Sequence, residues 1–126
     1  MTEAEDLSQR IDVIERGYEY LLAYAAQGRQ DDSGTEVRET LTKMHAALIG
    51  LSALLASVLE AASPKTTAES AGFIDTIADD ARKARGALAL VLSRPKISSL
   101  LVDNLNASIH LRALLTDVFL AEQSLK

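Results

Sequence analysis

The sequence of 126 residues contains no cysteine and no tryptophan. Without cysteine there is no disulfide, no thiol nucleophile and no thiolate metal site, which is typical of proteins in a reducing compartment. The first ten residues, MTEAEDLSQR, are acidic and lack the apolar stretch of a secretory signal. The cytoplasm is therefore the expected location.

A concentration of basic residues is also missing. The 13 Lys and Arg residues are scattered along the chain, and 18 acidic residues give a net charge of −5. Domains that bind nucleic acid gather their basic residues on one face, where they meet the phosphates. We therefore expect no nucleic-acid partner.

Proline and aromatic residues are scarce, and Ala and Leu dominate the apolar residues instead. Both residues lose little on entering a helix, so the composition favours an all-α fold. Hydrophobic residues make up 48% and charged residues 25%, values typical of a folded protein. The length suits one domain spanning residues 1–126.

Three short segments have the pattern of a helix N-terminus called a capping box, in which Ser or Thr precedes Glu by three residues. They are Thr2–Glu5, Ser33–Glu36 and Thr66–Glu69. A fourth start is marked by Pro95, which suits the first turn of a helix, with Ser98 or Ser99 as the cap. The sequence thus predicts four helices, near residues 2–27, 34–62, 66–92 and 96–124.

The apolar residues of each predicted helix recur at steps of three and four, which indicates one buried stripe per helix. In 96–124 that stripe is Leu101, Leu105, Leu115 and Phe119. Four long helices with short connections predict an antiparallel four-helix bundle, most simply up-down-up-down.

Residues 44–59, MHAALIGLSALLASVL, contain no acidic residue, Lys or Arg. A membrane span needs about 20 predominantly apolar residues, and this segment is shorter and includes His45, Gly50, Ser52 and Ser57. We expect no membrane span and interpret the segment as a helix covered by protein.

Three of the four predicted helices are apolar on more than one side, with 2–27 the weakest case. In 34–62, small residues oppose the bulky stripe and are accompanied by Ile49 and Leu54. In 96–124, four apolar residues lie away from the main stripe, namely Leu100, Leu111, Leu114 and Val118. Such surface is typical of a protein–protein interface. The predicted interface residues are Ala46, Ile49, Gly50, Ala53, Leu54, Ser57, Leu111, Leu114 and Val118.

Tyr18, His110 and Arg112 form the alternative site. Asp103, Asn106, His110 and Asp117 share one arc of 96–124, while Arg112 projects toward the predicted stripe. A buried Arg needs a carboxylate or an anionic ligand, although it can also extend along the core to water. These three residues are the candidate lining of a ligand-binding or catalytic pocket.

Helical di-iron sites use Glu-x-x-His, but Thr42 and Ala107 stand three residues before the two histidines. We assign no metal, cofactor or catalytic residue. We expect a protein that self-associates, as a homodimer or higher oligomer, or docks on a larger partner, through the apolar faces of 34–62 and 96–124.

Overall fold

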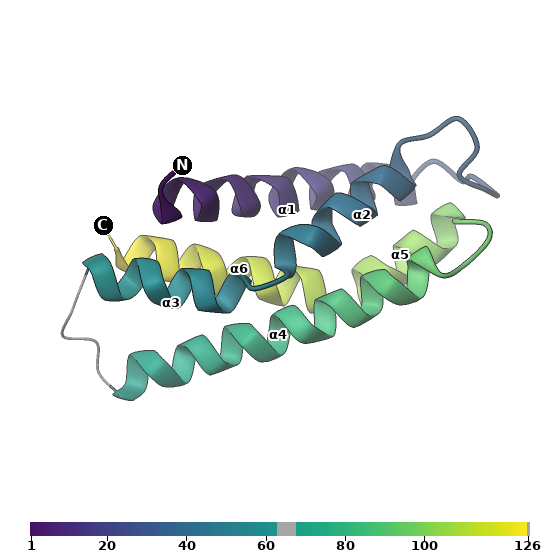
Figure 1. The fold of residues 1–126 in the computed structure, drawn as a ribbon. Coiled ribbons are helices and arrows are strands. Elements are labelled where there is room, and N and C mark those ends of the chain that lie inside the picture. The colour runs from purple at the N-terminus through teal and green to yellow at the C-terminus, as the bar shows by residue number, and fades with distance from the viewer. Residues whose placement is uncertain (63–67, 126) are drawn as a thin grey trace.

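Residues 1–62 and 68–125, which the computed structural model describes, contain six helices and no strand. The helices are α1 (Glu3–Ala25), α2 (Val37–Leu48), α3 (Leu51–Ala62), α4 (Ala68–Leu92), α5 (Ser99–Ala107) and α6 (His110–Ser124). The all-α prediction is confirmed (Figure 1). The helices predicted at 34–62 and 96–124 are each two helices separated by a break.

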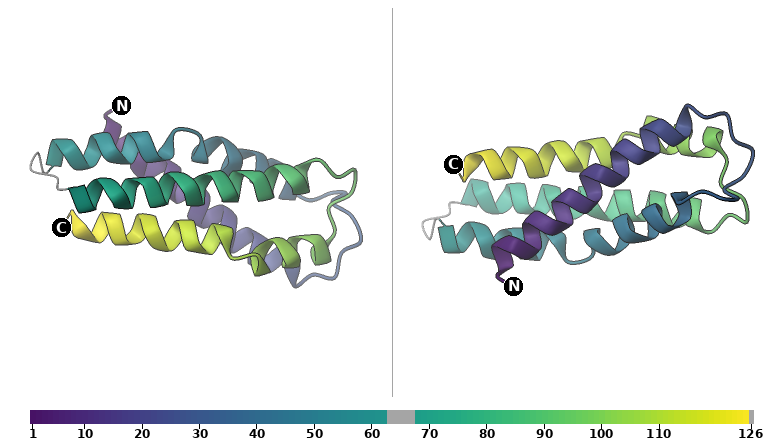
Figure 2. Two further views of the ribbon diagram at one scale, coloured as in Figure 1. Left: turned by 90° about the horizontal axis from the view of Figure 1, so that it is seen from below. Right: turned by 90° about the horizontal axis from the view of Figure 1, so that it is seen from above.

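The helices form two layers. α2–α3, α4 and α5–α6 lie side by side in one layer, and α1 crosses one face of that layer obliquely (Figure 2). The core lies between the layers and includes Ile14 and Leu21 of α1, Met44 of α2, Leu88 of α4 and Leu114 of α6, all fully shielded. A simple antiparallel bundle of four straight helices is not confirmed.

α1 and α2 approach each other closely at Gly17. A Cβ atom at this position would lie 2.4 Å from the sulfur of Met44, so only glycine fits without a shift of that side chain. This close packing lets α1 cover the apolar side of the second layer.

The predicted helix starts have different outcomes. α1 is capped as expected, because the Thr2 hydroxyl accepts a hydrogen bond from the Glu5 N–H at 3.1 Å. The capping box at Ser33–Glu36 is wrong: α2 begins at Val37, and Glu36 makes no side-chain cap. Thr66–Glu69 lies outside the described residues.

The fourth predicted start also needs a correction. α5 begins at Ser99 with Ser98 as its cap, and Pro95 precedes the helix rather than occupying its first turn. The Ser98 hydroxyl accepts from the Leu101 N–H at 3.0 Å. Of the two serines that the sequence left open, Ser98 is the cap.

Two loops at one end of the layers, residues 26–36 and 93–98, are joined by polar contacts. The buried Tyr24 hydroxyl donates to the carbonyl oxygens of Ile97 at 2.6 Å and Asp31 at 3.1 Å. Burial raises the pKa of Tyr24. The Ser99 hydroxyl donates to the Tyr24 carbonyl and accepts from the Arg29 N–H. These bonds satisfy groups that would otherwise be buried without partners.

Asp32 and Arg38 extend the same network. The Ile97 N–H donates to Asp32 at 2.9 Å and is the main reason that the pKa of this carboxyl lies below its ordinary value. The Arg38 guanidinium bonds Asp32 and donates to the carbonyls of Leu92 and Arg94, just where α4 ends. A cation at a helix C-terminus is favourable there, so Arg38 stabilises both loops.

Candidate functional site

The first half of the predicted interface does not form one helix face. Gly50 has a φ of 72° and separates α2 from α3, which are bent by 49° at this junction. Ala46, Ile49, Gly50 and Ala53 are exposed around the bend, whereas Leu54 and Ser57 are half-buried on α3. The Ser57 hydroxyl donates to Glu3 of α1 at 2.9 Å. The continuous stripe of small residues predicted here is therefore wrong.

The second half of the predicted interface lies inside the protein. Leu111, Leu114 and Val118 are at most 1% exposed and belong to the chain's own core. The prediction that they occupy an exposed face is wrong, because the break before α6 rotates this helix relative to α5. Phe119, predicted as core, is 37% exposed for the same reason.

Tyr18, His110 and Arg112 are not gathered at one hollow. Tyr18 is half-buried on α1 and packs against the core. His110 is half-buried at the first position of α6, and Arg112 is exposed on the same helix. The expectation that Arg112 projects toward the core is wrong, again because of the rotation of α6.

A hollow of about 340 Å³ is present on the outer side of α6. It is lined by Ile109, Arg112, Ala113, Thr116 and Asp117. The residues come from positions that share one side of a helix, so the hollow is a strip along α6 rather than a deep cavity. Arg112, a residue of the predicted polar site, lies here beside the exposed side chain of Ile109.

Asp117 is the electrostatically unusual group of this hollow. Burial, followed by the neighbouring carboxyl of Asp80 on α4, raises the pKa of Asp117 to about 7. Its Oδ2 atom is shielded from solvent and has no hydrogen-bond partner among the described residues. Two carboxyls that face each other favour a shared proton, and they also favour a nearby cation. Arg112 also lines the hollow, but among the described residues no ion pair joins it to Asp117.

Ile109 borders the hollow in a strained conformation. Its φ is 63°, in the left-handed region that β-branched residues rarely adopt, and it is the only residue other than glycine with positive φ in 1–62 and 68–125. Its side chain is 58% exposed. Glycine or asparagine would adopt this backbone conformation with less strain than isoleucine.

Another apolar side chain extends the hollow along α6. Leu120 is 59% exposed and lies one helical turn beyond Thr116. Ile109, Ala113, Thr116 and Leu120 therefore follow each other at steps of four, three and four, the spacing of a helix stripe. α6 lies at one edge of its layer (Figure 2). Ile109, Thr116 and Leu120 are exposed, and Ala113 is half-buried.

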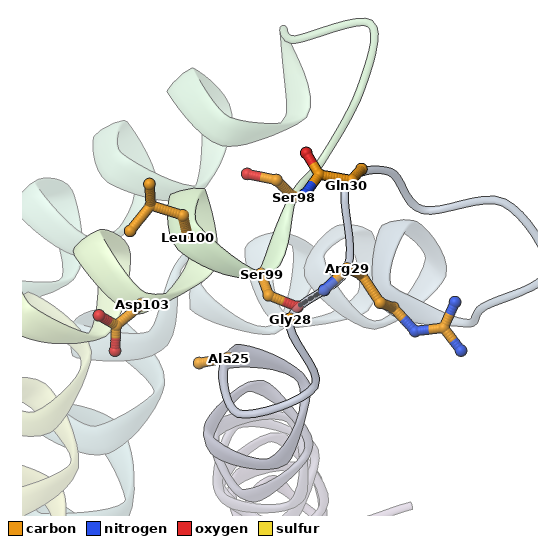
Figure 3. Close-up of a pocket in the computed structure, with 8 residues that line it drawn as sticks. All are labelled: Ala25, Gly28, Arg29, Gln30, Ser98, Ser99, Leu100 and Asp103. Atoms are coloured by element: carbon orange, nitrogen blue, oxygen red, sulfur yellow. Dashed lines mark hydrogen bonds between the residues drawn. The ribbon is translucent and has the colours of Figure 1, made fainter.

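A second hollow, of about 360 Å³, lies between the α1–α2 loop and the start of α5 (Figure 3). Its polar lining is engaged in the fold: the Ser99 hydroxyl bonds Arg29 and Tyr24, and Ser98 caps α5. The Arg29 guanidinium extends away from the hollow and bonds Gln27 at 2.8 Å. This hollow presents mainly structural groups, together with the exposed Leu100.

Among the described residues, no group of three or more potential metal ligands comes together. In the same part of the chain, no single helix is long and apolar enough to cross a membrane, although the bent pair of α2 and α3 has the composition for it.

Sequence reasoning missed the pairing of Asp80 with Asp117. It placed Asp117 correctly on the last helix but grouped it with Asp103 and His110, and it assigned nothing to Asp80. No spacing could have revealed the pair, because its members lie on different helices. Neither a family model, nor a curated protein, nor a solved structure matches the chain.

Proposed function

We propose that this chain works by binding protein, as a self-associating helical subunit that forms a homodimer or docks on a larger assembly. We assign it no reaction and place it in the cytoplasm on the basis of its cysteine-free composition. In this proposal α2–α3 and α5–α6 each serve as one bent rod of a four-rod bundle.

The observation that carries the proposal is the uncovered apolar surface of the helices. Among the residues that the structure describes, the large apolar side chains that are more than half exposed are Leu90, Leu100, Ile109 and Leu120, in addition to the N-terminal Met1. Single exposed leucines are common in monomers, but an aligned stripe such as that on α6 is typical of a contact surface.

The total surface supports the same conclusion. The chain has an accessible surface of 7265 Å², whereas a compact monomer of 13.5 kDa exposes roughly 6,500 Å². The excess is what an elongated pair of layers produces when its outer faces stay uncovered. Association would cover part of it, and burial of apolar area is the main driving force for such contacts.

The alternative, a ligand-binding or catalytic pocket lined by Tyr18, His110 and Arg112, has no comparable support. Arg112 lines the hollow on α6, and neither Tyr18 nor His110 is among the residues that line it. We therefore propose the binding function alone.

Light scattering coupled to gel filtration tests the proposal on the full chain, from micromolar to submillimolar concentration. We expect a mass that rises above 13.5 kDa toward twice that value as the concentration increases. A mass that stays at the monomer value over the whole range would contradict self-association.

A further inference from the structure

The connection between α5 and α6 is short and strained. It consists of Ser108 and Ile109, which separate Ala107 at the end of α5 from His110 at the start of α6. Ile109 has a φ of 63°, which is unfavourable for a β-branched residue. No side chain caps the start of α6, so its first N–H groups lack the partners that a preceding helical turn would supply. Both features favour a state in which Ile109 is helical.

The sequence around this connection also favours a continuous helix. Residues 106–112, NASIHLR, contain neither Gly nor Pro. On a helix continuous with α5, the residues Leu111, Leu114 and Val118 lie away from the stripe that α5 buries. In the structure the same three residues are at most 1% exposed and belong to the core. A straight α5–α6 helix therefore turns the apolar face of α6 away from the chain's own core.

We infer that two copies of this chain exchange their α6 helices. In the exchanged dimer α5 and α6 of each copy form one continuous helix, and each α6 occupies the position that α6 holds in the other copy. The surface that α6 leaves in one chain fits the same helix of a second chain, so the exchange needs no new contact surface. Short connections under strain favour such an exchange. Only one connection joins α6 to the preceding helices, so α6 can leave without displacing them.

The exchanged dimer keeps the contacts of α6 and loses the strain at both connections. The buried residues of α6 regain the same surroundings on α1, α4 and α5 of the second copy. They are Leu111, Leu114, Leu115, Val118 and Ala121. The entropy cost of association opposes the exchange, so we expect a dimer that is favoured at high concentration. It should form slowly, because α6 must leave one core before it enters another.

Crosslinking between two chains tests the exchange directly, because the natural chain has no cysteine. Asp80 of α4 lies beside Asp117 of α6. An Asp80→Cys chain is incubated at high concentration with an Asp117→Cys chain, and a short bis-maleimide is then added. In closed monomers the two cysteines belong to separate molecules, whereas exchange places them side by side. We expect a covalent dimer linked between positions 80 and 117, identified by mass spectrometry of the linked peptides.

A matched control uses two helices that are not exchanged. Glu3 of α1 and Ser57 of α3 are in contact, since the serine hydroxyl donates to the Glu3 carboxylate at 2.9 Å. A Glu3→Cys chain incubated with a Ser57→Cys chain should crosslink no faster than random collision allows.

Two substitutions at the connection test the role of the backbone separately from that of the side chain. Ile109→Gly relieves the strain of the closed form and weakens the continuous helix. It should therefore raise the dimer dissociation constant about tenfold or more. Ile109→Ala removes the same exposed side chain, but alanine is also strained at positive φ and favours a helix. It should change the constant by no more than a few-fold.

This inference names the contact for the proposed self-association and rests on it, and the outcomes separate the two. A wild-type chain that is monomeric at every concentration overturns both. A wild-type dimer that gives no 80–117 crosslink and responds alike to Ile109→Gly and Ile109→Ala overturns the exchange and leaves self-association standing. Should a cysteine variant fail to fold, the comparison of the two Ile109 variants decides.

Discussion

The protein breaks two of its long helices, and it does so in different ways. Between α2 and α3 the break occurs at Gly50, with a φ of 72°. The Arg10 guanidinium of α1 donates to the carbonyl oxygens of Ala47 and Ile49, where α2 ends, and also pairs with Asp6. Glycine adopts this conformation freely, and the arginine satisfies the free carbonyls.

Between α5 and α6 the residue with positive φ is Ile109, a β-branched residue with a φ of 63°. No side chain caps the start of α6, and the isoleucine side chain is exposed. Both breaks are capped within the chain, because the Ser108 hydroxyl donates to the Leu105 carbonyl oxygen at 2.6 Å where α5 ends. The difference is that the positive φ falls on glycine at the first break and on isoleucine at the second. The second break therefore retains backbone strain that the first avoids.

The largest expected effect comes from removing the glycine of the first break. Gly50→Val should lower the free energy of unfolding by about 2 kcal/mol, because a β-branched residue is strained at positive φ. Chemical denaturation monitored by circular dichroism measures this. Gly86→Ala is the matched control: Gly86 lies within α4 with open space around it, so alanine should stabilise by about 0.5–1 kcal/mol. If Gly50→Val left the free energy of unfolding unchanged, the role of Gly50 at the break between α2 and α3 would be contradicted.

Removing the arginine of the first break should have the next largest effect. Arg10→Met keeps the aliphatic part of the side chain but leaves two carbonyls without the guanidinium, so we expect a loss of about 1–1.5 kcal/mol. Arg16→Met is the control, because Arg16 is exposed on the same helix and pairs only with Asp12. Its loss should stay within about 0.5 kcal/mol. Equal effects at both positions would mean that Arg10 is not a cap.

How much could be predicted from the sequence differs between the two breaks. The spacing of the apolar residues located the helical segments, and the capping-box pattern located the Thr2 cap, because both signals are local. Gly50 was visible as a residue that favours positive φ, but its helical neighbours on both sides indicated a continuous helix. The contact from Arg10 to Ala47 and Ile49 joins distant parts of the chain, so no local pattern could reveal it.

At the second break the sequence was misleading. NASIHLR contains no Gly or Pro between Asn106 and Arg112, and propensity predicts a helix through it. Because a continuous helix through Ile109 is predicted, the buried side of α6 is predicted on the wrong face. Leu111, Leu114 and Val118 were assigned to the surface and Arg112 to the interior, the reverse of their positions.

The carboxyl pair beside the second break predicts a dependence of stability on pH. The folded-state pKa of Asp117 lies near 7, above its ordinary value, chiefly through burial and then through Asp80. The folded state therefore holds a proton that the unfolded state loses at lower pH. The stability that this proton contributes is fully present at acid pH and is lost as the pH rises through 7.

We expect this loss to be about 1 kcal/mol, because the pair is partly solvated. Unfolding of dilute protein at a series of pH values measures it, with Asp117→Asn as the variant that should flatten the profile between pH 5 and 8 (roughly the range above the unfolded-state pKa). Asp103→Asn is the control, since Asp103 is exposed on α5 and should leave the profile unchanged. A wild-type profile without this decline would contradict the assigned pairing.

The smallest expected effect is also the sharpest test of the comparison, because the same substitution is made at both breaks. Ile109→Asn should raise the free energy of unfolding of the dilute subunit by about 0.5–1 kcal/mol, since asparagine tolerates positive φ far better than isoleucine. Ile49 precedes Gly50 with a φ of −68° and is 49% exposed, so Ile49→Asn removes a similar side chain from an unstrained backbone and should not stabilise. Relief of backbone strain is available at position 109 and absent at position 49, so a gain in stability is expected at position 109 alone. If Ile109→Asn destabilised the subunit as much as Ile49→Asn, the isoleucine would serve the fold itself, and the difference between the two breaks would disappear.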